Sequence, residues 1–122
     1  MGVVLDKRLN YKTHIDKTLT SANATLRQLY AMMNRKSGLD MTNKLTIYKT
    51  ILRPIVTYAA PVWCGISDTQ MTRLEKFQNK CLRLITGQNR YARIADMLAE
   101  TGLETVREHV DRLSKRFYLT RL

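Results

Sequence analysis

Apolar residues recur along most of the chain at alternating steps of four and three, the spacing that places them on one face of an α-helix. The first such stretch runs from about Tyr11 to Lys36 and predicts an amphipathic helix. Its apolar positions are Ile15, Leu19, Ala22, Leu26, Leu29 and Met33. Arg35 and Lys36 suit the negative end of a helix dipole, and Gly38 suits a C-terminal cap.

The same rhythm resumes after Asp40, a suitable N-cap, and predicts a second helix that continues to Trp63. Its apolar positions are Met41, Leu45, Tyr48, Leu52, Ile55, Ala59 and Val62. Pro54 lies in the middle of this helix. Because proline removes one backbone hydrogen bond and disfavours helical geometry in the residue before it, we expect a kink or break there. Pro61 is expected to end the element or to add a second bend.

Capping signals define the remaining helices. Ser67 with Gln70 forms a capping box that opens a third helix, which Gly87 ends. The apolar positions of this third helix are Met71, Leu74, Phe77, Cys81 and Ile85. A short helix is predicted from about Ala92 to Glu100, stopped by Gly102. A second capping box, Thr105 with Glu108, opens a last helix whose inward positions are Val106, Val110, Leu113 and Phe117.

These elements predict an all-α fold, a small bundle of four main helices and one short helix. Residues 2–5 form a short β-like run with nothing in the chain to pair with. We therefore assign residues 1–9 to the end of a strand and a linker that belong to a preceding domain, and residues 10–122 to the helical domain.

The charge of the chain narrows its possible partners. The 122 residues include 21 Lys plus Arg and 10 Asp plus Glu, a formal net charge of +11. Such a surplus favours a polyanion such as DNA, RNA or an anionic membrane face. No run of eighteen or more apolar residues encodes a transmembrane helix. Cys64 and Cys81 lack metal-ligand spacing, so we expect packed thiols in a reduced, intracellular setting.

The sequence contains no catalytic constellation: no glycine-rich phosphate loop, no paired carboxylates beside a base, no HExxH and no nucleophile elbow. We therefore expect no catalytic residues and no cofactor in this chain. On the last helix the acids are spaced to pair with neighbouring bases, as Glu104 with Arg107, Glu108 with Arg112, and Asp111 with Lys115. That helix is expected to serve packing.

The third helix carries the candidate binding surface, a row of four cations on one face: Arg73, Lys76, Lys80 and Arg83. Such a row repels itself on an isolated helix, and a phosphate backbone would neutralise it. Gln78 and Asn79 flank the row and could bond to phosphate or sugar, Asn79 being closer to its basic side. Lys44, Lys49 and Arg53 could extend the surface. Tyr91 is the aromatic residue most suited to contact a base or sugar, while Tyr48 and Trp63 suit the core.

Several of these residues also carry a resemblance to a known family. Asn43-Lys44-Leu45, Tyr48-Lys49, Leu52-Arg53-Pro54-Ile55, Tyr58 and Trp63 resemble the region just after the palm of non-LTR retrotransposon reverse transcriptases, particularly jockey-like elements. Residues 77–83 match the Gln-Asn-Lys-x-Leu-Arg block of that family, and Leu5-Asp6, Leu9 and His14-Ile15 resemble its lead-in from the last palm strand. Where several jockey-type relatives have Asn-Ala-Pro-Trp, this chain has Gly87-Gln88-Asn89-Arg90-Tyr91.

The resemblance implies a thumb, a helical subdomain that closes over the template–primer duplex, an RNA–DNA hybrid, beside the polymerase site. It implies palm and fingers domains upstream, with a Tyr-x-Asp-Asp motif that binds Mg²⁺ and is absent from this chain. It also implies a retrotransposon ribonucleoprotein of nucleus and cytoplasm. A thumb follows a hybrid of any sequence, so it should contact phosphates and sugars in preference to bases.

Two other functions fit the same residues. The first is a helical protein-interaction or self-association module with a basic surface, in which an exposed Met32 or Tyr118 would contribute to an apolar patch. The second is a sequence-specific DNA binder that uses residues 94–110 as a helix-turn-helix, although the following helix is rich in acids where a recognition helix would meet phosphates.

Overall fold

The computed structural model describes residues 12–34, 36–58, 68–87 and 93–121, without the side chains of 118–121, and every regular element in these ranges is helical. This confirms the all-α prediction. The expected strand at residues 2–5 and the first domain boundary lie outside the described residues. So do Ser67 of the first capping box, Trp63, Cys64 and Tyr91.

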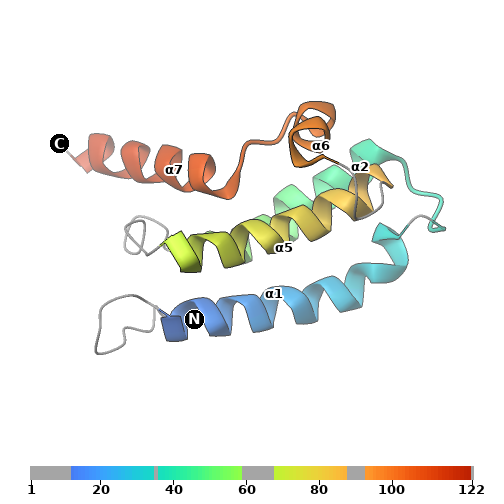
Figure 1. The fold of residues 1–122 in the computed structure, drawn as a ribbon, viewed down its shortest axis with the longest axis horizontal. Coiled ribbons are helices and arrows are strands. Elements are labelled where there is room, and N and C mark those ends of the chain that lie inside the picture. Colours follow the sequence, from blue (N-terminus) through green and yellow to red (C-terminus); the bar gives the residue numbers. More distant parts are fainter. Residues whose placement is uncertain (1–11, 35, 59–67, 88–92, 122) are drawn as a thin grey trace.

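The helices form three layers, and α5 lies in the middle one (Figure 1). Helix α1 (Lys12–Met33) forms one outer layer. In the middle, α5 (Asp68–Thr86) lies beside a broken helix made of α2 (Met41–Ile47), η1 (Tyr48–Leu52) and α3 (Arg53–Val56). Helices α6 (Ile94–Thr101) and α7 (Val106–Arg121) form the other outer layer. Helix α5 packs against α1, α2, α6 and α7, so it is the element that the others share.

The first helix follows its predicted stripe and ends earlier than predicted. Ile15, Ala22, Leu26 and Met33 are buried, and Leu19 and Leu29 pack against the core. The helix stops at Met33 because Asn34 Oδ1 accepts the backbone N–H of Lys36 at 2.8 Å, a local bond that competes with helix. Gly38 is predicted to cap this helix. It has φ +81°, but it lies in the turn that follows and does not cap α1.

The second helix is interrupted before Pro54, as predicted, and the interruption is a widened π turn. Helix α2 (Met41–Ile47) begins at Asp40, whose Oδ1 accepts the N–H of Asn43 at 2.8 Å, which confirms the predicted cap. The π turn η1 (Tyr48–Leu52) and then α3 (Arg53–Val56) follow, and Arg53 N–H donates to the carbonyl of Tyr48.

The widened turn changes which residues face the core after it. A π turn inserts one residue into the helical register. Val56 is therefore fully buried, whereas Ile55, predicted to be the inward position, is only partly buried. The predicted continuation through Ala59 and Val62 lies outside the described residues.

Helix α5 is buried over a wider face than the sequence predicts. The predicted stripe from Met71 to Ile85 is buried, and so are Gln78 within it and Leu82 beside it. Gln78 is 2% exposed and links three elements: it accepts from the Tyr48 hydroxyl at 2.6 Å and donates to the backbone carbonyl of Glu104 at 2.9 Å. The earlier suggestion that Gln78 contacts phosphate or sugar is therefore wrong.

The C-terminal helices begin and end close to the predicted positions. Gly102 ends α6 in the left-handed conformation, with its N–H on the carbonyl of Leu98 at 2.8 Å. The capping box that opens α7 is confirmed, because Glu108 N–H donates to Thr105 Oγ1 and Thr105 N–H donates to Glu108 Oε1.

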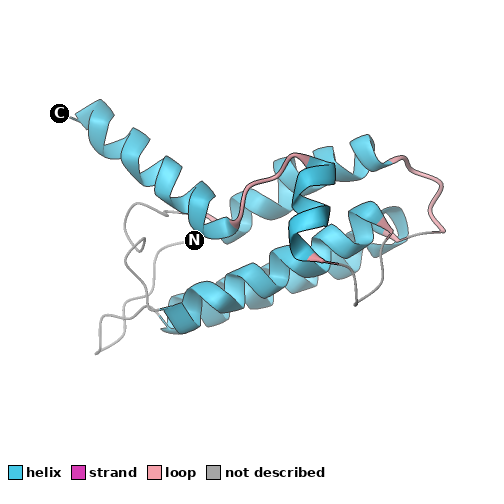
Figure 2. Ribbon diagram, turned by 45° about the horizontal axis from the view of Figure 1, so that its top comes forward, coloured by secondary structure: helices cyan, strands magenta, loops and turns pink. Residues whose placement is uncertain are grey.

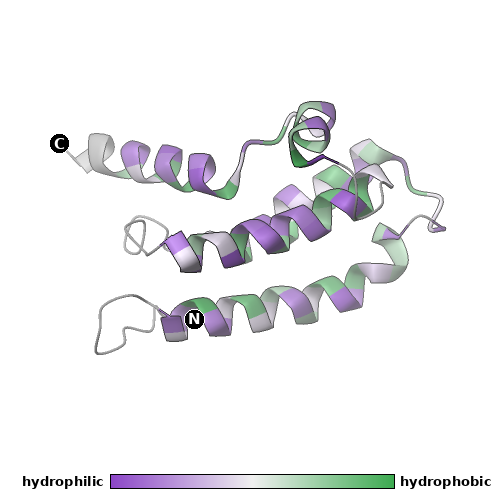
Figure 3. Ribbon diagram, in the orientation of Figure 1, coloured by the Kyte–Doolittle hydropathy of each residue, from purple (hydrophilic) through white to green (hydrophobic). Residues whose placement is uncertain are grey.

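Helix α7 runs away from the other helices toward its C-terminal end (Figure 2). Apolar positions recur along α7 among mostly polar ones (Figure 3). Val106 and Val110 are buried, but Phe117 is 37% exposed, so its predicted inward position is wrong. The cause is the divergence of α7 from the core, which no local pattern records.

Tyr48→Phe should lower the free energy of unfolding by about 1–3 kcal/mol, because Gln78 Oε1 would keep its buried position and lose its donor. Urea unfolding followed by circular dichroism measures the effect. Tyr30→Phe is the matched control, since Tyr30 is 53% exposed and its change should stay within about 0.5 kcal/mol. Equal unfolding midpoints for the two variants would contradict the role given to Gln78.

Candidate nucleic-acid interface

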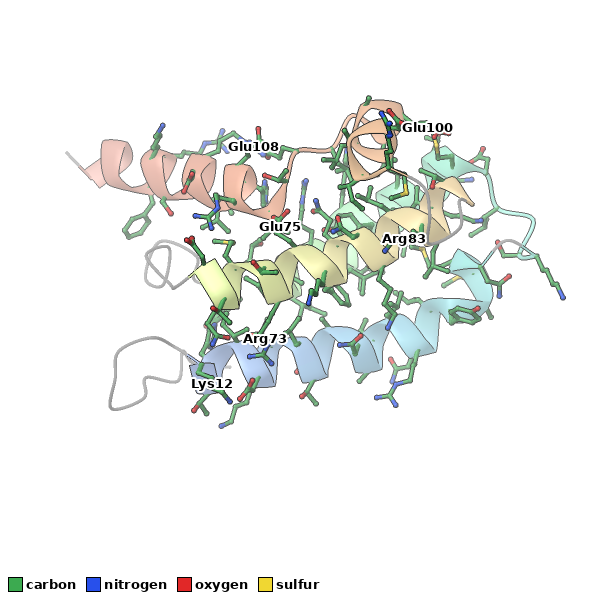
Figure 4. The ribbon with its side chains drawn as sticks, viewed as in Figure 1. Lys12, Arg73, Glu75, Arg83, Glu100 and Glu108 are labelled. Carbon is green, nitrogen blue, oxygen red and sulfur yellow. The ribbon has the colours of Figure 1, made fainter. Side chains whose placement is uncertain are left out.

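A shallow groove of about 300 Å³ runs between α1 and α5, and three of the four predicted cations line it. Arg73, Lys76 and Lys80 project from α5, and Leu19 and Asn23 form the wall on α1. Figure 4 shows Arg73 directed into the space between the two helices. The predicted spacing on α5 therefore produces a cationic surface, and the packing of α1 adds a second wall that the sequence reasoning did not foresee.

The first cation of the row is held in place by a carboxylate of α1. Arg73 Nη2 lies 2.6 Å from Asp16 Oδ1, and its Nη1 donates to Gln70 Oε1 at 2.8 Å. The hydrogen bonds from Arg73 and then Lys12 hold the pKa of Asp16 below its usual value. Because both side chains of the Arg73–Asp16 pair are about one-third or more exposed, the pair orients Arg73 more than it stabilises the fold.

The next two cations remain available to an anion. Lys76 and Lys80 are exposed, and within the described residues neither lies within 4 Å of a carboxylate. Lys80 Nζ instead donates to Asn23 Oδ1 across the groove at 3.2 Å. Their charges are therefore uncompensated at the surface, and a neutral amide positions one of them.

The last members of the predicted set are less accessible. Arg83 and Asn79 are partly buried. Arg83 Nε and Asn79 Oδ1 are buried without a hydrogen-bond partner in the part of the chain that the structure describes. Arg83 lies on the side of α5 that faces α6 (Figure 4). Neither residue lines the groove with Lys76 and Lys80, so the row of four divides into a groove and a flank.

Lys44 does not extend the basic surface as predicted. It is 5% exposed, and its Nζ donates to the backbone carbonyl of Asn34 at 3.0 Å, just beyond the end of α1. A cation at this position satisfies a terminal carbonyl and suits the negative end of the helix dipole. Lys44 therefore joins α2 to α1, and its ammonium group is engaged within the fold and not presented on the groove.

Lys49 and Arg53 are solvent-accessible but lie apart from the groove. Both line a different hollow, beside Gly102, Leu103, Glu104 and Arg112. They therefore do not line the α1–α5 groove with the α5 row, and their contact with nucleic acid stays a prediction. The two sites lie on different sides of α5, a relation that depends on how the helices pack. Tyr91 lies outside the described residues.

The acids near α7 neutralise bases, as predicted, but through other partners. Glu104 binds Arg112 at 2.5 Å, not Arg107. Arg107 pairs with Asp68 at 2.7 Å, and its backbone N–H donates to Glu75 Oε1 at 2.9 Å. Glu75 points from α5 toward the start of α7 (Figure 4). The contacts of Arg107 with Asp68 and Glu75 join α7 to α5. Its partners come from another helix and not from the predicted position three residues away along the chain.

His109 completes this cluster. Its Nδ1 lies 2.8 Å from Glu104 Oε1, and since a carboxylate only accepts, the tautomer with hydrogen on Nδ1 donates to Glu104. Burial lowers the pKa of His109 and outweighs the opposing effect of Glu104. The Glu104 pKa is lowered, mainly by its hydrogen bond from Arg112. At neutral pH the contact is a hydrogen bond from a neutral histidine.

In the described ranges no group of three His, Cys, Asp or Glu side chains is arranged to hold a metal ion. Over the same residues, none of the helices combines the length and apolarity needed to cross a membrane. Cys81 is buried on α5, and burial raises the pKa of its thiol to about 12. This cysteine is a packing residue.

Comparison with known proteins identifies relatives over nearly the whole chain. A probable RNA-directed DNA polymerase from transposon X-element of Drosophila melanogaster is 34% identical over 97% of the chain. The corresponding enzyme from transposon BS is 29% identical over 96% of it, and that from mobile element jockey of Drosophila funebris is 25% identical over 97%. The chain is homologous to one region of transposon RNA-directed DNA polymerases. The resemblance read from residues 43–58 and 77–83 is confirmed.

The chain spans about 13% of the length of each of these polymerases. No protein-family model matches it, and no solved structure matches it. The assignment to this region therefore depends on the sequence relatives, and the description of its surface depends on the helices and side chains above.

Arg73→Gln should raise the pKa of Asp16 toward its ordinary value, because it removes the largest cause of the lowering. The stabilisation from this depressed carboxyl is present above its unfolded-state pKa, and it is lost as pH falls through the folded-state value. A carbon-13 NMR titration of the Asp16 carboxyl measures the shift. Lys76→Gln removes an equal charge without touching Asp16, and an equal shift in that variant would show a general field effect instead of this contact.

Proposed function

We propose that this chain is the thumb of a non-LTR retrotransposon reverse transcriptase, and that its α1–α5 groove holds the template–primer duplex by sequence-independent contacts. The observation that carries the proposal is the groove itself, where Lys76 and Lys80 stand exposed without a carboxylate partner while Asp16 orients Arg73. Relatives named RNA-directed DNA polymerases, matching almost the full chain, supply the context.

The chemistry of the groove suits a phosphate backbone. Two lysines and an arginine, spaced along α5 by three and four residues, follow one side of the helix and span roughly 10 Å along its axis. The phosphate charges of one DNA strand recur about every 3.4 Å along the duplex axis, so a backbone could meet more than one of these cations. Lysine binds phosphate as a point charge, and contacts to phosphate carry no sequence information, as a sequence-independent grip requires.

The rest of the polymerase would supply the chemistry. We propose that the catalytic aspartates and their Mg²⁺ belong to a palm domain encoded elsewhere in the parent protein, and that this chain contributes binding only. The helix-turn-helix alternative is less favoured by the contacts at α7. Arg107 is engaged by Asp68, and Glu104 and Glu108 occupy the start of the helix that would have to meet DNA.

Reversing two charges tests the groove. The double variant Lys76→Glu with Lys80→Glu should bind a short RNA–DNA hybrid much more weakly than the parent chain. For this variant, the slope of log affinity against log salt concentration should be shallower by about one unit for each lost phosphate contact. Fluorescence anisotropy of a labelled hybrid at several salt concentrations measures both quantities.

The matched control reverses two exposed lysines outside the groove, Lys17→Glu with Lys36→Glu, and changes the net charge equally. A control that loses affinity and slope as strongly as the groove variant would show that net charge alone is sensed. A parent chain with no measurable hybrid affinity that sediments as a stable dimer would support the protein-interaction alternative, in which Met32, 43% exposed, would contribute to an apolar patch.

A further inference from the structure

A second hollow, of about 320 Å³, lies where η1 and α3 face the connection between α6 and α7. Lys49 and Arg53 line one side and Arg112 lines the other. The connection contributes Gly102, Leu103 and Glu104. Three cations thus surround one carboxylate, and this hollow belongs neither to the α1–α5 groove nor to the row predicted on α5.

The one carboxylate in the hollow is already engaged. Glu104 Oε1 accepts from both Nη2 and Nε of Arg112, at 2.5 and 3.1 Å, and it also contacts His109. Within the described residues neither Lys49 nor Arg53 has a carboxylate within 4 Å. Two uncompensated positive charges therefore remain at the rim.

The floor of the hollow is fixed by the buried core. The carbonyl of Glu104 accepts from Gln78 Nε2, and Gln78 Oε1 accepts from the buried Tyr48 hydroxyl. Tyr48 is the first residue of the π turn, which carries Lys49 and ends just before Arg53. The wall with Lys49 and Arg53 and the wall with Glu104 are therefore both held by the Tyr48–Gln78 pair. Such a site is positioned before any ligand arrives, which reduces the entropic cost of binding.

The hollow and the groove face different directions. Lys80 reaches Asn23 of α1, whereas Gln78, two residues earlier, reaches Tyr48 and Glu104. Residues two apart on an α-helix point about 200° from one another. An anion in the hollow would therefore lie on the opposite side of α5 from one in the groove.

We propose that this hollow is a second phosphate-binding site, which takes the backbone of a nucleic-acid segment other than the duplex held in the α1–α5 groove. Guanidinium and ammonium groups on two walls can donate hydrogen bonds to the negatively charged oxygens of a phosphodiester. An acidic protein segment would need apolar contact as well, and Leu103, the one apolar residue that lines the hollow, is only 6% exposed. The chain would then hold two nucleic-acid segments at once.

The test isolates the hollow from the groove. The 122-residue chain carrying Lys76→Glu and Lys80→Glu is titrated with a single-stranded tetranucleotide, and nitrogen-15 NMR follows the Gly102 amide and the Nε–H signals of Arg53 and Arg112. We expect these signals to shift. Adding Lys49→Gln, an exposed position, should weaken the binding several-fold, whereas Lys17→Gln should leave it unchanged.

Three results would overturn the proposal: no shift at these signals, a binding constant that Lys49→Gln leaves unchanged, or a glutamate-rich peptide that binds the hollow more tightly than the oligonucleotide. The groove is judged separately, by the hybrid affinity of the Lys76→Glu, Lys80→Glu variant. Loss of hybrid affinity in that variant with no shift at Gly102 would reject the second site alone. Unchanged hybrid affinity together with a shift at Gly102 would reject the groove alone.

Discussion

The arrangement of this domain depends on one buried amide. Gln78 lies in the middle of α5, accepts from the hydroxyl of Tyr48 and donates to the carbonyl of Glu104. A buried side-chain amide without partners would cost free energy, so this pair of bonds also selects which elements may lie on this face of α5. The broken second helix and the α6–α7 connection are the two that supply them. Both basic sites therefore have α5 as a common wall or floor.

The charge of the chain is distributed by the same packing. Its acids are used mainly to orient bases or to join helices: Asp16 orients Arg73, Glu104 holds Arg112, and Asp68 and Glu75 receive Arg107. Lysines are left exposed on either side of α5, at Lys76 and Lys80 and at Lys49. Part of the net charge of +11 is thus gathered at two sites, and local concentrations of positive charge attract a polyanion.

The proposed grip on a duplex requires cations that keep a stable spacing. The groove cations project from a helix with a broad buried face, and the cations of the hollow project from the π turn, from the start of α3 and from the first half of α7, near the buried Val106 and Val110. Side chains on such supports would keep their spacing while a nucleic-acid duplex moves past them. Relatives that are named RNA-directed DNA polymerases are consistent with this use.

The sequence by itself determined the helices, most of their ends and the cationic face of α5, because those features depend on residues three or four positions apart, on caps such as Asp40 and Thr105, and on glycines at 87 and 102. The family was also visible in short runs of residues. Tertiary structure decided the rest. It buried Lys44 against the end of α1, turned Phe117 outward, placed Asn79 and Arg83 outside the groove, and gave Arg107 and Arg112 partners from other segments. These outcomes depend on the angles at which helices cross and on the extra residue in the π turn, and neither is encoded in the spacing along a single helix.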